Sequence, residues 1–434
     1  MSPEKTLTEP DRLFQAIPEP VVGLCRRLAG AGKRGWVVGG CVRDSLLGLA
    51  AKDWDVATDA RPEEVQRIFR RVIPTGIKHG TVTVVLGGVG YEVTTLRGEG
   101  EYRDGRHPEA VTFLDDIEED LARRDFTFNA IALDPLARTI VDPFDGQRDL
   151  ARGLLRAVGV ALERFVEDGL RVLRAARFAA ALECEVEAST LRAMAAPEAH
   201  RTLAKVSPER VHDEWQKAMK ARRPSIAFSL MRSTEVLPLH APELASLADD
   251  VYARGLERID RCPSDPPLRL AALCLELGDT PTLGADEAEA LLRRLRFSND
   301  DRNRILHLVR HQLAEGDAPS SWSDAALRRW LRAVTPSRLD DVVTLAEASR
   351  EGDAKAEASA LGARARAMLA EGVALETRDL AVRGKDLMQA LELSPGRHIG
   401  ELLEALLERV LDEPSLNQAE RLIEVARGLR GGAA

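Results

Sequence analysis

Segments rich in β-branched residues are concentrated in residues 35–97, and this uneven distribution constrains the fold more than any other feature of the sequence. Such segments, bounded by glycine, proline or aspartate, are typical of short strands. They span 35–42, 53–58, 81–88 and 91–97. Helical periodicity is predicted for 11–32, 43–49 and 61–72, and again from residue 161 to the end. The sequence therefore predicts an α+β protein in which one small mixed sheet precedes a long all-helical part.

Length and composition are those of a soluble protein with several structural units. A chain of 434 residues is longer than one hydrophobic core usually organises, so about two to four units are expected. The N-terminus is polar and no apolar run approaches the ~20 residues of a membrane span, so neither a signal peptide nor a span is predicted. Scattered cysteines without a CxxC pair predict buried thiols, with no disulfide partner and no zinc site. They are Cys25, Cys41, Cys184, Cys262 and Cys274. We expect a cytoplasmic protein.

The charge distribution limits how the chain can bind nucleic acid. A net charge of −9 argues against bulk nonspecific binding. Residues 201–223 are an exception, because they carry seven basic residues against three acidic ones. A local RNA contact is compatible with this segment, and so is an ordinary solvated helix face.

Two aspartates, Asp53 and Asp55, stand either side of a tryptophan in the second predicted strand. Side chains at i and i+2 leave the same face of a strand, so both carboxylates are predicted to point together. Paired carboxylates suit Mg²⁺, which binds protein oxygens together with substrate phosphates. Glu92, on a later strand, is the candidate third acidic group, able to help hold metal or to activate a hydroxyl. The alternatives are exposed strand-end aspartates and a surface glutamate on an edge strand.

A phosphate site is predicted directly before these carboxylates. Gly39 and Gly40 permit a close backbone approach, and the helix that follows presents unpaired N–H groups with Arg43 beside them. A triphosphate and a metal would then meet at one place.

Five segments that occur together, in one order, carry a family resemblance. They are 35–58, 123–135 (RRDFTFNAIALDP), 142–150 (DPFDGQRDL), 167–182 (EDGLRVLRAARFAAAL) and 209–219 (ERVHDEWQKAM). In this order and spacing the chain resembles the bacterial class II tRNA nucleotidyltransferase and poly(A) polymerase family over roughly residues 20–225. The resemblance implies a small mixed-sheet, polymerase-β-like nucleotidyltransferase head at 1–145, a helical neck at 146–225 and a helical body and tail at 226–434.

The resemblance also implies roles for individual residues. It implies that the nucleotide is contacted by Gly39, Gly40 and Arg43. It also implies that magnesium is bound by Asp53 and Asp55. Arg124 and Asp125 are similar to the pair that contacts the incoming nucleotide and senses its ribose, with Asn129 in support. A carboxylate can accept from a 2′-hydroxyl and so distinguish ribose from deoxyribose. An intra-helix salt bridge of Arg123 or Arg124 is the alternative interpretation.

The segment that begins at Glu167 matches the family's base-selecting helix. Glu167 and Arg171 are predicted to share a face, with Asp168 one position round and Arg174 and Arg177 continuing near that side. A guanidinium beside a carboxylate presents a hydrogen-bonding edge able to pair with cytosine or adenine without a template. Taken alone, the Glu167–Arg171 spacing is that of a surface salt bridge.

Two segments suggest which activity of the family applies. Residues 74–84 lack the basic GRRF-like segment usual in poly(A) polymerases, and 97–108 is similar to the flexible loop needed for the terminal adenosine. The resemblance thus implies addition of CCA to tRNA from CTP and ATP. An A-adding enzyme, a poly(A) polymerase and, more distantly, a non-catalytic RNA-binding protein remain open.

The helical second half departs from one related pattern. Residues 266–279 resemble a helix of HD-domain relatives, but Leu275 and Glu276 stand where the metal-binding His-Asp pair would be. His307 and His311 are four residues apart without the glutamate of an HExxH site. We therefore expect a helical remnant that packs like its relatives and contacts tRNA.

Overall fold

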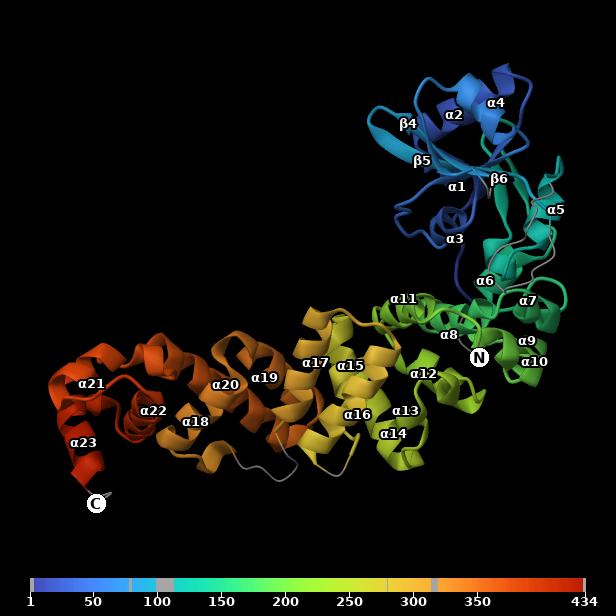
Figure 1. Ribbon diagram of the computed structural model, residues 1–434. Helices are drawn as coiled ribbons and strands as arrows, with labels where there is room; N and C mark the ends of the chain where they lie inside the picture. Colours follow the sequence, from blue (N-terminus) through green and yellow to red (C-terminus); the bar gives the residue numbers. More distant parts are fainter. Residues whose placement is uncertain (1–3, 78–79, 99–112, 279, 314–318, 432–434) are drawn as a thin grey trace. The chain divides into compact units, whose positions relative to one another are not determined.

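The computed structural model describes residues 4–77, 80–98, 113–278, 280–313 and 319–431, and the chain divides into two compact units. The first unit comprises Met1–Ser246 with Arg293–Arg296, and the second comprises Leu247–Leu292 with Phe297–Ala434. Strands are concentrated in the first unit, and helices build the second (Figure 1). The predicted α+β class is confirmed.

A seven-stranded mixed sheet forms the head of the first unit. Its order is β3 (Val72–Gly76), β4 (Thr81–Leu86), β5 (Val89–Thr95), β2 (Asp55–Thr58), β1 (Gly35–Val38), β6 (Ala132–Asp134) and β7 (Thr139–Val141). The pair β2–β5 is parallel, and its neighbours in the sheet pair antiparallel. β2 is therefore the central strand, and its first residue, Asp55, lies between β5 and β1.

Helices cover both faces of this sheet. α2 (Glu19–Gly30) and α4 (Pro62–Ile68) contact β1 and β4, whereas α3 (Gly40–Leu46) follows β1 and lies on the other side of the sheet in Figure 1. All four residues of β1 are buried, because both faces of the strand are covered. The fully buried Trp36 of β1 packs in a cluster with Leu96 and Leu121.

Several element boundaries differ from the sequence predictions. The helix expected over 11–32 is two helices, α1 (Pro10–Gln15) and α2, because Pro18 is extended between them. The helix expected over 61–72 ends at Ile68, since Val72 pairs with Val84 in the sheet. β3, β6 and β7 were not predicted. Most of the loop predicted at 97–108 lies outside the described residues.

Helices continue the first unit beyond the sheet. They are α5 (Ile117–Ala122), η2 (Thr127–Asn129), α6 (Gly146–Ala151), α7 (Ala161–Glu167), α8 (Leu170–Leu182), α9 (Ala188–Met194), α10 (Pro197–Leu203), α11 (Pro208–Met219), α12 (Ser225–Ser233), η3 (Leu237–Leu239) and α13 (Pro242–Ala245), with the short strands β8 (Leu154–Leu155) and β9 (Glu185–Val186). α8 contacts α11 and α12. Phe178 of α8 lies 5.8 Å from Phe126 and 5.6 Å from Phe128, measured between ring centroids. This aromatic cluster fixes α8 to the head.

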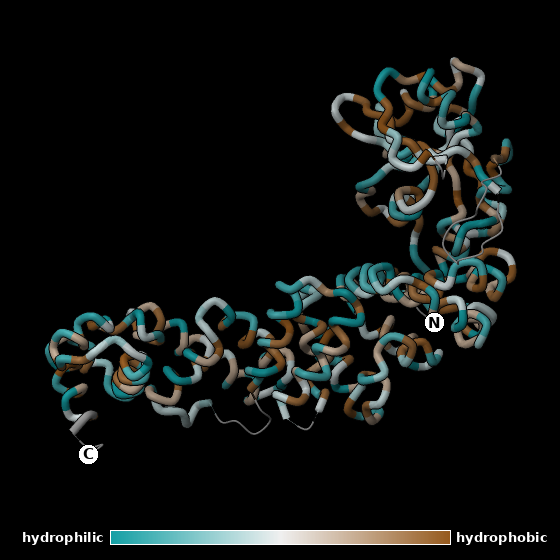
Figure 2. Tube along the Cα trace, in the orientation of Figure 1, coloured by the Kyte–Doolittle hydropathy of each residue, from teal (hydrophilic) through white to brown (hydrophobic). Residues whose placement is uncertain are grey.

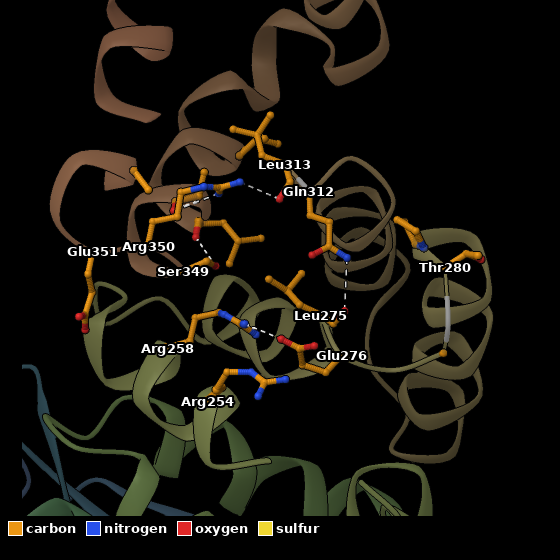
Figure 3. A pocket seen from close by; sticks show the side chains of 16 residues that line it. Arg254, Arg258, Leu275, Glu276, Thr280, Gln312, Leu313, Ser349, Arg350 and Glu351 are labelled. Carbon is orange, nitrogen blue, oxygen red and sulfur yellow. Dashed lines mark hydrogen bonds and ion pairs between the residues drawn. The ribbon is translucent and has the colours of Figure 1, made fainter. Parts of the chain in front are cut away.

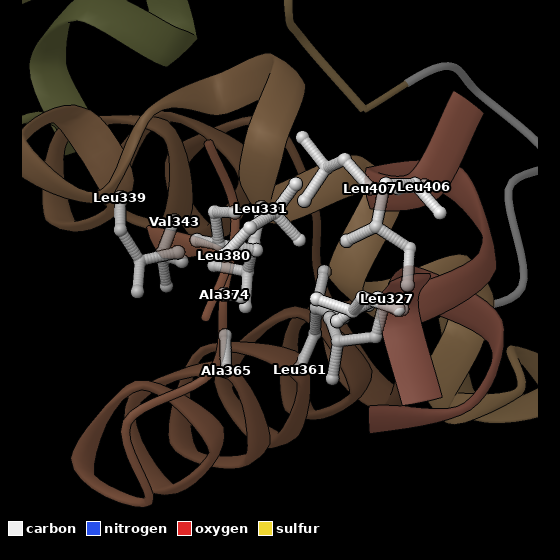
Figure 4. Close-up of a cluster of buried hydrophobic side chains, with 14 of the residues drawn as sticks. Leu327, Leu331, Leu339, Val343, Leu361, Ala365, Ala374, Leu380, Leu406 and Leu407 are labelled. Atoms are coloured by element: carbon white, nitrogen blue, oxygen red, sulfur yellow. The ribbon is translucent and has the colours of Figure 1, made fainter. Parts of the chain in front are cut away.

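Among its described residues, all regular secondary structure of the second unit is helical. It contains α14 (Asp249–Arg261), α15 (Pro266–Cys274), most of α16 (Pro281–Arg294), α17 (Asn299–Arg310), η4 (Pro319–Ser321), α18 (Asp324–Val334), η5 (Pro336–Arg338), α19 (Leu339–Ala348), α20 (Gly352–Ala370), η6 (Thr377–Asp379), α21 (Gly384–Leu391), α22 (Arg397–Asp412), η7 (Pro414–Leu416) and α23 (Ala419–Gly431). Hydrophilic and hydrophobic residues alternate along these helices (Figure 2), as expected when one face of each helix packs inward. Leu327, Leu331, Leu361 and Leu406 meet in one buried cluster (Figure 4). Over the stretches described, no helix has both the length and the apolar character needed to cross a membrane.

Candidate active site

The glycine turn after β1 brings three predicted site elements together. Gly39 has φ +83°, a left-handed conformation that favours glycine, and it precedes α3. A Cβ added at Gly39 would lie 3.5 Å from Nη1 of Arg124 and 3.7 Å from Oδ2 of Asp55. At Gly40 it would lie 3.6 Å from Nη2 of Arg43. The turn is therefore a point where the backbone, two guanidinium groups and a carboxylate converge.

The sheet register places Glu92 beside Asp55. Val56 pairs with Val93 in the parallel β2–β5 ladder, so the residues before them, Asp55 and Glu92, are neighbours on one face. β5 is an inner strand, so Glu92 is not the edge-strand residue considered above. Asp53 precedes β2, which begins only at Asp55. The strand argument for the two aspartates is therefore wrong in detail, because only Asp55 belongs to the ladder.

The three carboxylates nevertheless act on one another electrostatically. The pKa of half-buried Asp55 is raised to about 6, chiefly by burial and also by the charges of Glu92 and Asp53, while Arg124 opposes the shift. Three like charges thus converge near one guanidinium, an arrangement that a divalent cation would stabilise. Within the described ranges, no group of three or more His, Cys, Asp or Glu side chains is arranged to hold a metal alone. The donor set therefore fits a cation that takes one or two protein carboxylates and completes its shell with substrate oxygens.

Arg124 also takes part in the salt bridge that was considered as its alternative. Nη2 of Arg124 lies 3.4 Å from Asp120, a buried residue of α5, and Arg123 lies 2.7 Å from the same carboxylate. Nη1 of Arg124 donates to the Asn129 carbonyl at 3.2 Å. Its Nε is buried and has no acceptor among the residues described. Arg124 is therefore held on one side by Asp120 and faces the Gly39 turn on the other.

Asp125 is buried and fully engaged. Its Oδ2 accepts from Nε and Nη2 of Arg174 at 2.8 and 2.5 Å, and its Oδ1 accepts from Asn129 at 3.0 Å and from the Phe126 N–H at 2.9 Å. Burial alone would raise the pKa of Asp125, but Arg174 and Asn129 lower it to about 2. The carboxylate is therefore charged at neutral pH and anchors α8 to the head.

Asn129 extends this network to the glycine turn. Its amide Nδ2 donates to Asp125, while its Oδ1 accepts from Nη1 of Arg43 at 3.0 Å. Arg43 also donates to Asp44 at 2.7 and 2.9 Å. A continuous chain of hydrogen bonds thus runs from Arg43 through Asn129 and Asp125 to Arg174.

The sequence predicted one helix for the segment expected to select the base, but the structure divides this segment between two helices. α7 ends at Glu167 and α8 begins at Leu170. A Cβ at Gly169 would lie 2.3 Å from the Leu203 nitrogen, so the close approach of α10 requires glycine at the break. The predicted proximity of Glu167 and Arg171 holds across this break, with the ion pair at 2.8 Å. The salt bridge considered as the alternative is thus formed, but it is not a surface pair, because the two side chains are only 12% and 19% exposed.

Asp168 is held at the same break by two donors. Its Oδ1 accepts the Leu170 N–H and its Oδ2 accepts Nη2 of Arg210, each at 3.0 Å. Arg210 belongs to the basic segment 201–223, so part of that segment is neutralised within the fold. Sequence reasoning did not single out Arg210.

Phe178 was also missed. The guanidinium carbons of Arg43, Arg174 and Arg177 lie 5.0, 5.4 and 3.7 Å from the centroid of its ring. Nε of Arg177 donates to buried Glu214 at 2.5 Å. The signal was available, because Phe178 directly follows Arg177 and stands four residues after Arg174.

In the HD-like region, the residues that differ from the metal-binding patterns of its relatives contact other parts of the helical packing. Glu276 accepts from Arg258 at 2.7 Å. The ring of His307 contacts the Val334 carbonyl at 2.6 Å and lies 4.4 Å from the His311 ring. Both Glu276 and His307 therefore have structural partners in the helical packing.

Comparisons with known proteins agree with this architecture. Residues 35–156 match the family model of the poly A polymerase head domain, residues 185–247 match "Probable RNA and SrmB- binding site of polymerase A", and residues 271–426 match tRNA nucleotidyltransferase domain 2. The fold is thus that of a nucleotidyltransferase.

Full-length relatives define the family more narrowly. The chain is 32% identical to the CCA-adding enzyme of Ligilactobacillus salivarius over 97% of both proteins, and 33% identical to that of Lactiplantibacillus plantarum over 97% of this chain and 98% of the relative. The crystal structure of the Bacillus stearothermophilus CCA-adding enzyme in complex with CTP matches with a TM-score of 0.77 at 30% identity, over 97% of this chain and 98% of that one. The chain belongs to the family of CCA-adding enzymes. Membership implies the use of a divalent metal ion.

Proposed function

We propose that this protein adds CCA to the 3′ end of tRNA, without a nucleic-acid template, using CTP and ATP. The observation that carries the proposal is the convergence of Asp55, Glu92 and Arg124 at the Gly39 turn. Next to this turn, buried Asp125 pairs with Arg174, which lies on the segment expected to select the base. This arrangement supports a phosphate site that is linked to a base-selecting site within one unit. The names of the relatives support the same reaction.

The reaction is a phosphoryl transfer. The 3′-hydroxyl oxygen of tRNA attacks the α-phosphorus of the nucleotide, a new P–O bond forms, and the bond to the β-phosphate oxygen breaks to release pyrophosphate. The hydroxyl proton passes to a carboxylate of the site, for which Glu92 is our candidate. Gly39, Gly40 and Arg43 contact the nucleotide, as backbone N–H groups and a guanidinium suit phosphate oxygens.

Asp53 and Asp55 are the proposed ligands of Mg²⁺. A hard cation with oxygen ligands suits two carboxylates and a triphosphate, and when bound it would offset the charge that develops on the phosphate oxygens. Burial, and then repulsion from Glu92 and Asp53, raise the pKa of Asp55, so a bound cation would help to keep this carboxylate charged.

Nucleotide choice is assigned to the Asp125 network and the α7–α8 junction. A ribose 2′-hydroxyl that donates to Asp125 must compete with Asn129 and Arg174 for the carboxylate oxygens of Asp125. Binding of the ribose would therefore alter the hydrogen bonds of Arg174 directly. Glu167, Asp168 and Arg171 are the proposed partners of the base edge, with Arg174 and Arg177 alongside. Because Arg171 donates to the Arg123 carbonyl at 2.8 Å, base selection is also tied to the head.

The remaining parts of the proposal concern organisation. The division into head, neck and body with tail at 1–145, 146–225 and 226–434 is kept as a functional division, with tRNA contacts on the neck and body. A cytoplasmic location fits five free, buried cysteines.

Nucleotide incorporation separates the members of this family. Purified protein is given tRNA lacking its last three nucleotides, or tRNA ending in CC, with labelled CTP and ATP supplied separately. We expect CTP to be added to the first RNA and ATP to the second. ATP incorporation without CTP incorporation would identify an A-adding enzyme, and long A tails on unrelated RNA would identify a poly(A) polymerase.

A further inference from the structure

A cavity in the second unit has no role in the reaction proposed above. It has a volume of about 590 Å³ and lies between α14, the turn after α15, and α19 with the start of α20 (Figure 3). This volume is typical of sites for small molecules. The lining combines guanidinium groups with aliphatic side chains, so the cavity is chemically divided.

One side of the cavity carries arginines from α14. Arg258 is only 8% exposed; its Nη1 donates to the Ala272 carbonyl at 3.0 Å and its Nη2 donates to Glu276 at 2.7 Å. Its Nε is buried and lacks a hydrogen-bond acceptor among the described residues. Arg254 lies one turn away, half-exposed, with Nη1 on Asp250. A buried donor of this kind costs free energy unless an acceptor reaches it.

Two helix N-termini add positive potential at the same cavity. Thr280 and Pro281, at the start of α16, are part of the lining, and so is Ala354 in the first turn of α20. Glu351 precedes α20, but its side chain does not cap the helix and instead pairs with Arg261. Both helices have more than eight residues. In α16, Pro281 has no N–H and the Leu283 N–H donates to Thr280 Oγ1 at 3.3 Å, so the free N–H groups that favour an anion are those in the first turn of α20.

The opposite side is apolar. Leu313, Val342 and Leu345 line it, and Gln312 lies at its border with Nε2 on the Leu275 carbonyl at 3.3 Å. The amide oxygen of Gln312 is an acceptor for an amino group. A flat, weakly polar ring would suit this wall, while an anionic group would suit the arginine side.

We propose that this cavity binds a mononucleotide, with its phosphate at Arg254 and Arg258 and its base against Val342 and Leu345. The site is separate from the nucleotide site of the first unit and goes beyond the proposed function. Guanidinium groups and the N-terminus of α20 recognise the phosphate, and the aliphatic wall with Gln312 recognises the base.

Binding of AMP to the full chain tests the proposal. Isothermal titration is done in EDTA on the Arg174→Met variant, which perturbs the nucleotide site of the first unit. We expect AMP to bind with one equivalent and inorganic phosphate to compete. Adding Arg258→Met, which keeps the aliphatic length but removes the buried donor, should weaken AMP at least tenfold. Arg254→Ala should weaken it too, and it tests the site without touching a buried group.

The matched control is Arg378→Ala, which removes an exposed arginine elsewhere in the second unit and should leave AMP affinity unchanged. Failure of AMP to bind, failure of phosphate to compete, or equal affinity with and without Arg254→Ala would overturn the proposal. Incorporation of CTP by the Arg254→Ala single variant is measured in parallel and should match the wild type. AMP binding thus tests the mononucleotide site, and CTP incorporation tests the proposed function, so either proposal can fail without the other.

Discussion

Replacement of Gly169 by alanine tests whether the α7–α8 break is set by the approach of α10. Gly169 has φ −59° and ψ −24°, which any residue adopts, so alanine meets no backbone strain there. Its Cβ would however lie 2.3 Å from the Leu203 nitrogen, 2.5 Å from the Leu203 Cα and 2.6 Å from the Thr202 carbonyl carbon. These are backbone atoms, so no side-chain rotation relieves the contact, and α10 must move by about 1 Å.

The size of the effect follows from two opposed contributions. Overpacking of a close contact costs about 1–3 kcal/mol, and the lower entropy of unfolded alanine returns about 0.4–1 kcal/mol. Gly169→Ala should therefore lower the free energy of unfolding of the first unit by about 1–2 kcal/mol. The transition temperature should fall by about 2–4 °C for each kcal/mol, measured by calorimetry or circular dichroism.

Activity should fall further than stability. Glu167 and Asp168 lie on one side of the break and Arg171 on the other, and a displacement near 1 Å can lower a rate by about 100-fold. Incorporation of CTP is measured at a temperature where the variant is folded. The control is Gly23→Ala in α2, where no atom lies within 4 Å of the added Cβ and about 0.5–1 kcal/mol of stabilisation is expected. Equal stability and activity of Gly169→Ala and wild type would refute the reasoning.

Two further predictions concern the hydrogen-bond network around Asp125, and a third concerns the titration of His240. Arg174→Met should lower the free energy of unfolding of the first unit by about 3 kcal/mol in urea, because it leaves buried Asp125 without its ion-pair partner. This value is the low end of the range for a broken buried pair, since the Arg174 side chain is 33% exposed. An Arg174→Met variant as stable as the wild type would contradict the prediction. Asn129→Asp should destabilise more than Asn129→Ala, since it sets a second carboxylate against Asp125; the reverse order would count against the network. Burial, assisted by Arg294, lowers the pKa of His240 from 6.5 to about 4, so the unfolded chain takes up a proton first as the pH falls. The free energy of unfolding should therefore drop by about 2 kcal/mol between pH 7 and pH 5 because of His240. In His240→Leu the drop over the same pH range, measured by urea unfolding, should be smaller than in the wild type by about this amount.

Much of the fold could be predicted because β-branched runs and helical periodicity are local signals. Residues 81–86 and 89–95 form strands close to where they were expected. β6 and β7 have three residues each and pair with β1 and with each other; runs this short, even the β-branched residues 139–141 of β7, were not recognised as strands. The break at Gly169 was missed for a similar reason, because α10 that enforces it is distant in sequence.

The candidate site shows the same division. The residue types and spacings of Asp53, Asp55, Arg124 and Asp125 were visible in the sequence. The position of Glu92 beside Asp55 depends on the parallel β2–β5 pairing, with β3 and β4 inserted between them in the chain. Partners such as Arg210 for Asp168 and Glu214 for Arg177 come from a helix distant in sequence, so only packing could identify them.

The most direct test of the account is CTP incorporation into tRNA lacking its last three nucleotides by the Asp55→Asn variant. Asp55→Asn keeps the shape of the side chain and removes one charge of the carboxylate cluster. Asp115→Asn, at a carboxylate of the head that is 88% exposed, serves as the matched control, and thermal unfolding checks that both variants fold. We predict that Asp55→Asn lowers the rate by about 100-fold or more while Asp115→Asn keeps it. A folded Asp55→Asn variant that adds CTP at nearly the wild-type rate would contradict the assignment of this cluster as the site of nucleotide addition.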